Sequence, residues 1–500
     1  MELHTILLLC ISLFCWFFLR TYLHSKSRKL PPGPNGFPII GSLLELGSKP
    51  NHSLANLAKI HGPLMTLKLG SVITIVASSP ETAKEILQKH DKTLSARTVP
   101  DVITAQPNPE ATLAWVTGDK WRNRRRICST QMFTNQRLDS LQEIRHEKVA
   151  QLVNHMRKQC QSGAAVDIGR VAFATTLNLM SSTIFSTDIV DPEFETAQEF
   201  KDLVWRIMED SVKPNLSDYF PIIRWLDLQG VKRHIKPAYL RLHEIFDQVI
   251  EKRVEDRALG MKKTGDFLDV LLDQCEEEGS GFDRQTIKPL ILDLFLAGSD
   301  TSAITTEWAM AELLRNPQKL QKVREEILQQ IGTERPVKES DIEKLPYLQA
   351  VVKEVMRLHP AVPLLLPHKA QEDTEIFGFI VPKNSQVLVN AWAIERDPKY
   401  WEKPLEFLPE RFLIKSSVDY KGRDFEYIPF GAGRRICPGM PLAIRMVNLM
   451  LASIVQPFSW NLPKGMAPEN LDMEEQFGLT LRKAIPLLAI PSMEENKALI

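Results

Sequence analysis

One cysteine lies in a stretch whose residue types could hold a metal-bearing cofactor. Residues 429–439 read PFGAGRRICPG and precede an apolar run with helical spacing, so Cys437 lies just before a helix N-terminus. Unpaired amides and the positive end of the helix dipole favour the thiolate there, which is the form that binds metal. The glycines allow the backbone to approach a flat ligand, and Arg434 and Arg435 offer cations for acidic groups on that ligand. The simpler alternative is a buried cysteine beside an ordinary turn.

A polar run interrupts a long apolar segment with helical spacing. The segment from about Asp283 to Arg315 contains AGSDTS at residues 297–302. Gly298 alone costs about 1 kcal/mol relative to alanine in a helix, and Ser, Asp and Thr compete for backbone hydrogen bonds. Something other than helix stability therefore explains the run, which places an acid, Asp300, beside an alcohol, Thr301. The alternative is a helix boundary with Asp300 as the N-cap.

Two further pairs have helical spacing. Glu354 and Arg357 are spaced i,i+3 in EVMR, and Trp121 and Arg125 are spaced i,i+4 in WRNRRRIC, so each pair shares one helix face. Taken alone, a Glu-x-x-Arg pair is most often a surface ion pair worth less than about 1 kcal/mol. The pairs gain meaning only together with the cysteine stretch.

The cysteine stretch carries a resemblance to a known family. Its pattern is Phe-x-x-Gly-x-Arg-x-Cys-x-Gly, formed by Phe430, Gly433, Arg435, Cys437 and Gly439. This pattern resembles the haem-binding signature of the cytochrome P-450 haem-thiolate monooxygenases, and the resemblance extends from end to end of the chain. It implies a mainly α fold with a minor β component (α+β), in a single large cytochrome P-450 fold with an N-terminal transmembrane helix.

The resemblance also implies the cofactors and partners. Haem b (iron protoporphyrin IX) would be bound through the Cys437 thiolate, and O2 and electrons derived from NADPH would be co-substrates. Those electrons would arrive through NADPH-cytochrome P-450 reductase. The 62 basic and 62 acidic residues argue against a general nucleic-acid binder. Four basic residues near the first third would be a solvated helix face or a docking surface for the reductase: Lys120, Arg122, Arg124 and Arg126.

The resemblance assigns roles to the polar residues. Asp300 and Thr301 would relay protons to bound oxygen, beside a local opening of the helix. Glu354 and Arg357 would form a buried structural network with a third residue, Arg411 of FLPERF, which braces the loop leading to the cysteine. The haem propionates would contact Trp121, Arg125, Arg435 and His368, the last standing where arginine is common in plant relatives. A histidine there can donate a hydrogen bond, but its charge would depend on pH.

The substrate pocket would lie where family members line it. The expected segments are the loop from Val99 to Trp115, AVPLLL at 361–366 and FGLT at 477–480, which are largely apolar and favour a lipophilic substrate. The expected lining residues are Trp115, Leu296, Ala297, Val362, Leu364, Gly478 and Leu479. Several runs, including LPYLQAVVKEVMRLHP, resemble the plant subgroup of geraniol hydroxylases and terpenoid oxidases, which implies hydroxylation of a plant terpenoid. A phenolic, alkaloid or xenobiotic substrate is the alternative, since residues 105–121 depart from the pattern expected of the first pocket loop.

Two other classes of protein are alternatives. A haem-thiolate isomerase or dehydratase would need neither oxygen nor a reductase, but such members typically lose the acid–alcohol pair that is intact at Asp300 and Thr301. A non-catalytic membrane binder of haem or lipid would have no need of the polar run at 297–302.

The N-terminus predicts a membrane anchor. Residues 5–19 carry no charge, and a span of about 3–23 has the length of roughly 20 residues that crosses a bilayer. Basic residues follow at Lys26, Arg28 and Lys29, so the positive-inside rule places the body of the chain in the cytosol. A cleaved signal peptide, the alternative, would carry its positive charges before the apolar run. We therefore expect an anchor at 1–30, a Pro-rich hinge at 31–41 and a catalytic domain at 42–500, on the endoplasmic reticulum membrane as a single-pass protein.

Local patterns predict the elements that position these residues. Residues 64–80 read as two strands around Gly70-Ser71, and residues 374–394 as another hairpin. Apolar stripes predict helices over 318–332, ending at Gly332, and over 346–359, ending before Pro360. In most of the remaining chain, the apolar residues recur at helical spacing.

Overall fold

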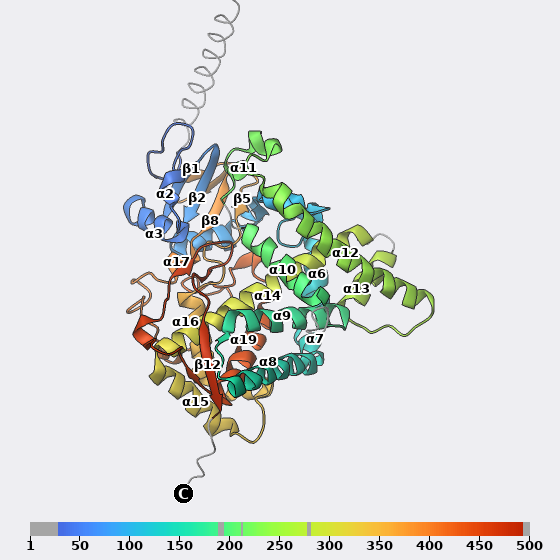
Figure 1. The fold of residues 1–500 in the computed structure, drawn as a ribbon. Helices are drawn as coiled ribbons and strands as arrows, with labels where there is room; N and C mark the ends of the chain where they lie inside the picture. The colour runs from blue at the N-terminus through green and yellow to red at the C-terminus, as the bar shows by residue number, and fades with distance from the viewer. Residues whose placement is uncertain (1–28, 189–194, 212–213, 278–281, 494–500) are drawn as a thin grey trace, which may run out of the picture.

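A computed structural model describes residues 29–188, 195–211, 214–277 and 282–493, so most of the expected anchor at 1–30 lies outside the described residues. The described chain is a helical body whose main sheet lies at the upper end, while β12 (Leu488–Met493) of a separate three-stranded sheet lies in the lower part (Figure 1). This arrangement agrees with a mainly α fold that has a minor β component. In these described parts, no helix combines the length and the apolar composition needed to cross a membrane.

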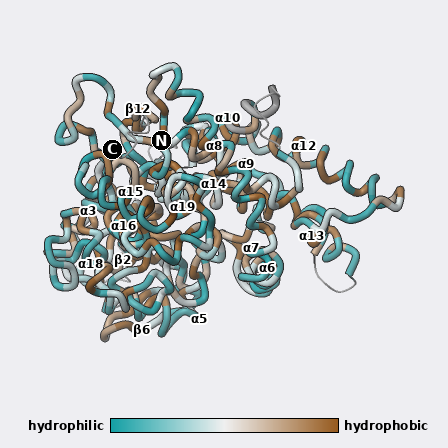
Figure 2. The backbone as a smooth tube through the Cα atoms, turned by 90° about the horizontal axis from the view of Figure 1, so that it is seen from below, coloured by the Kyte–Doolittle hydropathy of each residue, from teal (hydrophilic) through white to brown (hydrophobic). Residues whose placement is uncertain are grey.

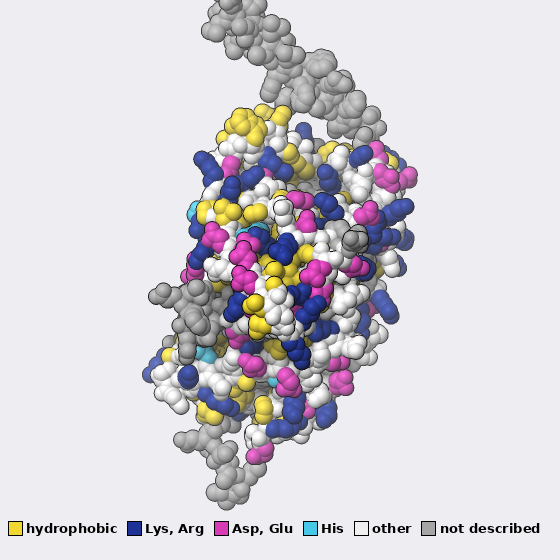
Figure 3. Space-filling view, turned by 90° about the vertical axis from the view of Figure 1, so that its right-hand side faces the viewer, with side chains coloured by type: hydrophobic (Ala, Val, Ile, Leu, Met, Phe, Trp, Pro, Cys, Tyr) yellow, Lys and Arg dark blue, Asp and Glu magenta, His cyan; other side chains and the backbone are white. Residues whose placement is uncertain are grey.

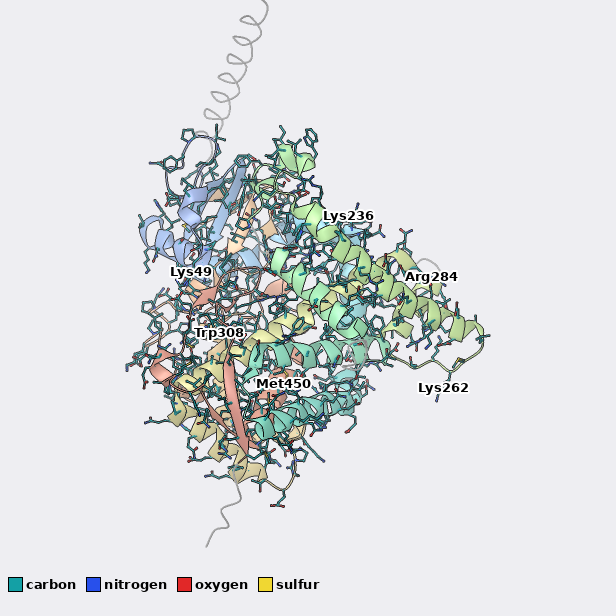
Figure 4. All side chains as sticks on the ribbon, viewed as in Figure 1. Lys49, Lys236, Lys262, Arg284, Trp308 and Met450 are labelled. Carbon is teal, nitrogen blue, oxygen red and sulfur yellow. The ribbon has the colours of Figure 1, made fainter. Side chains whose placement is uncertain are left out.

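The long helix α14 (Arg284–Arg315) runs through the interior. It packs against α9 (Ile168–Phe185) and α19 (Met440–Val455). Figure 2 shows α14 and α19 in the middle of the helical body from a second direction. Figure 4 places Trp308 of α14 within the body, whereas Lys262 lies at its margin. The middle of α14 therefore lies in the interior of the body.

Three predicted helices are confirmed. The N-cap of α14 is Asp283, whose side chain accepts a hydrogen bond from the Thr286 amide at 2.8 Å. Helix α15 (Pro317–Ile331) ends at Gly332, which has a φ of 80°. Helix α16 (Pro346–Leu358) ends before Pro360. Both α15 and α16 begin with proline, which a first helical turn tolerates.

The expected local opening of the helix at 297–302 was wrong, as was the alternative boundary at Asp300. Helix α14 is continuous through these residues. Gly298 is instead required by packing, because a Cβ there would lie 2.8 Å from the Met180 sulfur of α9. The hydroxyl of Thr301 donates to the Ala297 carbonyl at 2.7 Å, so it is satisfied within the helix.

The main sheet has the strand order β1-β2-β8-β5-β3. Strands β1 (Leu64–Leu69) and β2 (Val72–Ala77) form the predicted antiparallel hairpin. The second predicted hairpin is only partly right. Strands β6 (Thr374–Ile376) and β7 (Phe379–Val381) pair with each other, whereas β8 (Gln386–Val389) pairs in parallel with β2. The apolar β8 is buried because it lies inside the larger sheet.

The remaining elements complete the two regions. The main sheet is completed by β3 (Ala96–Arg97) and β5 (His368–Lys369). The same part of the chain contains α2 (Leu43–Leu46), α3 (Pro50–His61), α4 (Pro80–Lys84), the π-helical η1 (Glu85–Lys89), α5 (Asp91–Leu94) and α17 (Ala391–Ile394). The helical body contains α6 (Gly118–Gln131), α7 (Asn135–Ser140), α8 (Gln142–Ser162), α10 (Glu195–Asp210), α11 (Leu216–Tyr219), α12 (Val231–Ala258), α13 (Phe267–Glu276) and α18 (Glu410–Ile414). Short strands are β4 (Val166–Asp167), β9 (Phe458–Asn461), β10 (Glu475–Gln476), β11 (Arg482–Lys483) and β12 (Leu488–Met493). Short 3₁₀ helices include η2 (Asp101–Ala105), η3 (Pro109–Ala111), η4 (Pro221–Leu226), η5 (Glu339–Lys344), η6 (Gly433–Arg435) and η7 (Pro468–Asn470).

Candidate active site

A cavity of about 320 Å³ lies between α14 and the Cys437 loop. Its walls come from α14, α12, the loop at 97–115, the turn at 361–368 and the loop at 429–439. Most of the lining atoms are apolar. The apolar walls suit a lipophilic ligand, and the few polar groups are therefore informative.

Cys437 lines this cavity, just before the start of α19. The Cys437 amide donates to the Phe430 carbonyl at 3.0 Å, which closes the loop, and the helix begins at Met440. Burial raises the pKa of the thiol, while the backbone amides of Gly439 and Met440 and the charge of Arg125 oppose that rise. A metal cation at this position would deprotonate a coordinating thiol outright.

Three arginines also line the cavity: Arg97, Arg125 and Arg435. Arg435 donates to the Ser95 and Val116 carbonyls at 2.9 and 2.7 Å, and its guanidinium lies 4.1 Å from the Trp121 ring centre. Within the described ranges, none of these arginines pairs with a carboxylate. Burial lowers the pKa of Arg97 to about 9 and that of Arg435 to about 10. Partly desolvated cations without counter-ions favour an anionic ligand.

Arg97 is a site residue that sequence reasoning missed. It lies directly opposite His368 in the β3–β5 pair, and it donates to the Leu366 carbonyl at 2.6 Å. Its Nε has no partner in the described structure. The only sequence signal was an arginine in the short segment SARTVP, whose pairing with residue 368 is not local.

His368 lines the cavity but differs from the expected pH-dependent cation. Its Nδ1 lies 2.7 Å from the Leu94 carbonyl, which can only accept, so Nδ1 carries the proton. Burial, together with the charges of Arg97 and Arg435, holds the pKa of His368 well below its usual value. The neutral ring therefore leaves Nε2 as an acceptor, and Arg97 supplies the positive charge at this edge.

The acid and the alcohol of α14 are placed differently. Thr301 lines the cavity, and with Phe430 it also lines a small adjoining pocket. Asp300 is 1% exposed and does not line the cavity, because its carboxylate turns to Arg482 of β11, whose Nη2 donates at 2.7 Å. Burial raises the pKa of Asp300, and Arg482 opposes the rise. Sequence reasoning also missed Arg482, which lies 182 residues further along the chain.

The glycines of the Cys437 loop have different functions. Gly431 and Gly439 line the cavity, as expected of a backbone that approaches a ligand. Gly433 does not line it. Its φ is 65°, and a Cβ there would overlap the Leu87 carbonyl of η1. Gly433 is therefore required by the packing of the loop against η1.

Most of the expected pocket residues line the cavity, namely Trp115, Leu296, Ala297, Val362 and Leu479. Two do not. Leu364 packs against the cluster of α3, β1 and β8 residues, because the turn directs it toward the sheet. Gly478 also lies outside the lining, next to Leu479. Among the basic residues of α6, Arg124 is 5% exposed and so is not part of a solvated face.

Glu354, Arg357 and Arg411 meet in the interior. Two nitrogens of Arg357 donate to the Glu354 carboxylate at 2.8 and 2.9 Å, and Arg411 donates to it at 3.0 Å. Arg357 also donates to the carbonyls of Glu395, Pro404 and Glu406. The triad thus connects α16 to the segment that leads toward the cysteine.

These residues fit haem. Haem b is a flat and largely apolar ring with a central iron and two propionates. The cavity presents a thiol at the start of a helix, apolar walls, and arginines that lack counter-ions in the described structure. Cys437 could hold the iron, while Arg97, Arg125 and Arg435 could hold the propionates.

The chain is similar to proteins of known activity. Residues 31–487 match the family model described as Cytochrome P450. Geraniol 8-hydroxylase of Catharanthus roseus is 48% identical over 98% of this chain and 100% of its own length. Geraniol 8-hydroxylase of Swertia mussotii is 49% identical over 93% of this chain and 94% of its own length. Drimenol monooxygenase of Persicaria hydropiper is 44% identical over 94% of this chain and 93% of its own length. Such enzymes take electrons from redox partner reductases and act on lipophilic substrates. The chain therefore belongs to the cytochrome P450 family, as a monooxygenase that uses haem iron, molecular oxygen and electrons from NADPH.

Proposed function

We propose that this protein hydroxylates a plant terpenoid at the end of the cavity nearest to Cys437. The observation that carries the proposal is an apolar cavity lined by both Cys437 and Thr301. The names of the relatives in the comparison, which include geraniol and drimenol, support a terpenoid substrate. The relevant electron donor would be NADPH-cytochrome P-450 reductase.

Reconstitution tests this function. The purified full chain is mixed with that reductase, NADPH and a panel of terpenoid alcohols and hydrocarbons. The expected product is a terpenoid that has gained one oxygen atom, labelled when ¹⁸O2 is supplied. Turnover of phenolic or alkaloid substrates alone would reject the terpenoid assignment, and a rearranged or dehydrated product without ¹⁸O would indicate an isomerase or dehydratase.

Each cavity residue has a role in this proposal. Haem iron with an axial thiolate favours cleavage of the O–O bond, which is the chemistry that the cofactor supplies when bound. Cys437 would hold the iron, and the amides of Gly439 and Met440 would stabilise the negative charge of its thiolate. Phe430 and Gly439 would pack against the ring, with Trp121 stacked on Arg435 at its edge. Gly433 would act indirectly, by holding the loop on η1.

Replacing Arg97 would weaken haem binding without weakening the haem-free fold. We expect Arg97→Met to release haem to apomyoglobin about 10- to 100-fold faster, since a hydrogen bond to a charged group contributes about 1.5–3 kcal/mol. The haem-free variant should unfold at the same denaturant concentration as the wild type or higher, because a buried cation without a carboxylate partner is removed.

Arg434→Gln is the matched control for Arg97. Arg434 belongs to the cysteine loop, is exposed and pairs with Asp91 at 3.0 Å. Its variant should retain haem as the wild type does. Equal haem release by Arg97→Met and the wild type would contradict the proposed propionate contact.

Asp300 and Thr301 would deliver protons from the protein side. Thr301 presents its hydroxyl at the cavity, while Asp300 lies behind it, held by Arg482. Besides Arg482, the side chain of Thr480, a residue that lines the cavity, forms a hydrogen bond with the Asp300 carboxylate and opposes the rise in its pKa. A proton could therefore pass from the Arg482 side of α14 to the cavity side through Asp300 and Thr301.

Removing the Thr301 hydroxyl should uncouple NADPH oxidation from product formation. We expect Thr301→Ala to lower the product formed per NADPH by about 10²-fold, the lower range for a positioned proton donor, with hydrogen peroxide formed instead. Thr301→Ser should restore most of the yield. Thr306→Ala is the matched control, because that hydroxyl donates to the Ser302 carbonyl at 2.9 Å but does not line the cavity. An unchanged ratio of product to NADPH in Thr301→Ala would reject this role.

The remaining expectations concern the membrane, where 1–30 would anchor the protein to the endoplasmic reticulum, with 31–41 as a hinge and 42–500 as the cytosolic catalytic domain. Exposed apolar side chains support a lipid contact beside the hinge: Phe37, Ile39, Leu44, Ile222 and Trp225, the last two being 84% and 80% exposed. Figure 3 shows hydrophobic side chains at the upper end of the molecule, where α11 lies in Figure 1. The segments around residues 40 and 219 both contact the turn between β1 and β2. The Gly70 amide of this turn donates to the Ile40 carbonyl at 3.0 Å, and its Ser71 amide donates to the Tyr219 carbonyl at 2.9 Å. Failure of the full chain to float with liposomes would contradict the proposed membrane attachment.

A further inference from the structure

Two side chains cover the buried acid of α14. Arg482 donates to the Asp300 carboxylate at 2.7 Å, and the same guanidinium lies 4.5 Å from the ring centre of Trp205 on α10. Trp205 is 45% exposed, so it forms the outer layer of this stack. Asp300 does not line the cavity. A proton that leaves Asp300 for the cavity therefore needs a further polar group between the two.

Thr480 reaches both Asp300 and the cavity. Its side chain forms a hydrogen bond with the Asp300 carboxylate, and the residue is one of those that line the cavity. The two residues that follow hold this segment on α14. The Leu481 carbonyl accepts a hydrogen bond from the Trp308 indole at 3.0 Å, and Arg482 binds Asp300 itself. Thr480 is thus fixed beside the acid by contacts on both of its chain neighbours.

The Thr301 hydroxyl lines the cavity as well, but its hydrogen is directed elsewhere. It donates to the Ala297 carbonyl, one turn back along α14, at 2.7 Å. A hydroxyl carries one hydrogen and two acceptor positions, so Thr301 presents acceptor positions to the cavity. Thr480 differs because its partner is a carboxyl group, whose proton can be present or absent.

The protonation of Asp300 decides the direction of its hydrogen bond with Thr480. A carboxylate can only accept, and it then holds the Thr480 hydrogen. A protonated carboxyl group can donate, which makes Thr480 the acceptor and leaves its own hydrogen free to point into the cavity. Burial raises the pKa of Asp300, and the charge of Arg482 and the hydrogen bond from Thr480 oppose that rise. One hydroxyl can therefore accept on the Asp300 side and donate on the cavity side.

We propose that Thr480 is a further residue of the proton route, the hydroxyl that carries protons from Asp300 into the cavity beside Thr301. This inference rests on the proposed monooxygenase function and deepens it. In each transfer the O–H bond of Asp300 breaks, Thr480 gains that proton, and Thr480 gives its own hydroxyl proton to the oxygen that is reduced to water. No electrons move in this step. Asp300 remains as a carboxylate and takes a new proton from water on the Arg482 side.

Infrared spectroscopy of the full haem-loaded chain tests the contact without relying on turnover. The carboxyl band of Asp300 is identified by its loss in Asp300→Asn, and its intensity is followed as the pH changes. Thr480→Val should raise the pH midpoint of this band, because a hydrogen bond that stabilises the carboxylate is lost. Thr480→Ser should restore the midpoint of the wild type. An unchanged midpoint in Thr480→Val would overturn the contact and the proposal with it.

Coupling of NADPH oxidation to product formation tests the transfer itself, with reductase present and geraniol as the first terpenoid probe. Thr480→Val should lower the product formed per NADPH by about 10²-fold, with hydrogen peroxide formed instead, and Thr480→Ser should restore most of it. Thr306→Val is the matched control, because this buried threonine of α14 does not line the cavity. A wild-type ratio in Thr480→Val would overturn the relay and leave the hydrogen bond as a structural contact.

A peroxyacid separates proton delivery from substrate placement. The reagent meta-chloroperbenzoic acid gives one oxygen atom to the terpenoid and leaves as the carboxylic acid, so this reaction takes no protons or electrons from outside. With this reagent, Thr480→Val should form product at the wild-type rate and at the same carbon. A loss of product, or oxidation at another carbon, would overturn the proposal and mean that Thr480 positions the substrate.

These results are distinguishable from failure of the proposed function. A wild type that shows no thiolate haem spectrum, or that oxidises no terpenoid, rejects the function, whereas the infrared midpoint still reports the contact between Thr480 and Asp300. The carbon monoxide spectrum of each variant confirms that it is folded around haem.

Discussion

Substituting Glu354 by glutamine is expected to remove most of the folded, haem-loaded protein. The Glu354 carboxylate accepts hydrogen bonds from the side chains of Arg357 and Arg411 and from the Leu408 amide. Both Glu354 and Arg357 are fully buried. Loss of the charge leaves two guanidinium groups without their only carboxylate partner in the described residues. Breaking a buried ion pair costs about 3–5 kcal/mol, against a total stability of about 5–15 kcal/mol.

Chemical denaturation of the haem-loaded protein measures this effect. The unfolding midpoint of Glu354→Gln should fall, and the yield of thiolate-ligated protein should fall with it. The control is Glu244→Gln, since Arg241 and Glu244 have the same i,i+3 spacing at the surface and lie 3.1 Å apart. That variant should show no measurable shift. A Glu354→Gln midpoint equal to that of the wild type would mean that the triad does not brace the fold.

Local spacing made several parts of this structure predictable. Helix α14 was predictable from its apolar period, and the β1–β2 hairpin from Gly70-Ser71 between two apolar runs. The residues of the triad were predictable because the pair Glu354–Arg357 is local and the family resemblance supplied the third partner, Arg411. In these cases, the residues that specify the element are close together in sequence or in a known pattern.

Contacts between distant segments were not predictable. Arg482 meets Asp300, and Arg97 pairs with His368, across long separations that no local pattern encodes. Gly298 suggested an open helix, but its reason is the contact with Met180. In each case a tertiary neighbour determines the function of the side chain, and the sequence does not reveal that neighbour.

The second large effect is expected at Cys437. A serine there should abolish both thiolate ligation and oxygen insertion, because a neutral hydroxyl cannot supply the electron density that a thiolate gives to iron. Cys160→Ser is the matched control: Cys160 is half-buried at the end of α8 and does not line the cavity. Its variant should keep both the spectrum and the turnover.

The carbon monoxide difference spectrum of dithionite-reduced protein tests the central claim most directly. We predict a strongly red-shifted Soret band in the wild type and in Cys160→Ser, and its absence from Cys437→Ser. A histidine-type band in the wild type, or an unchanged red-shifted band in Cys437→Ser, would contradict the assignment of Cys437 as the iron ligand.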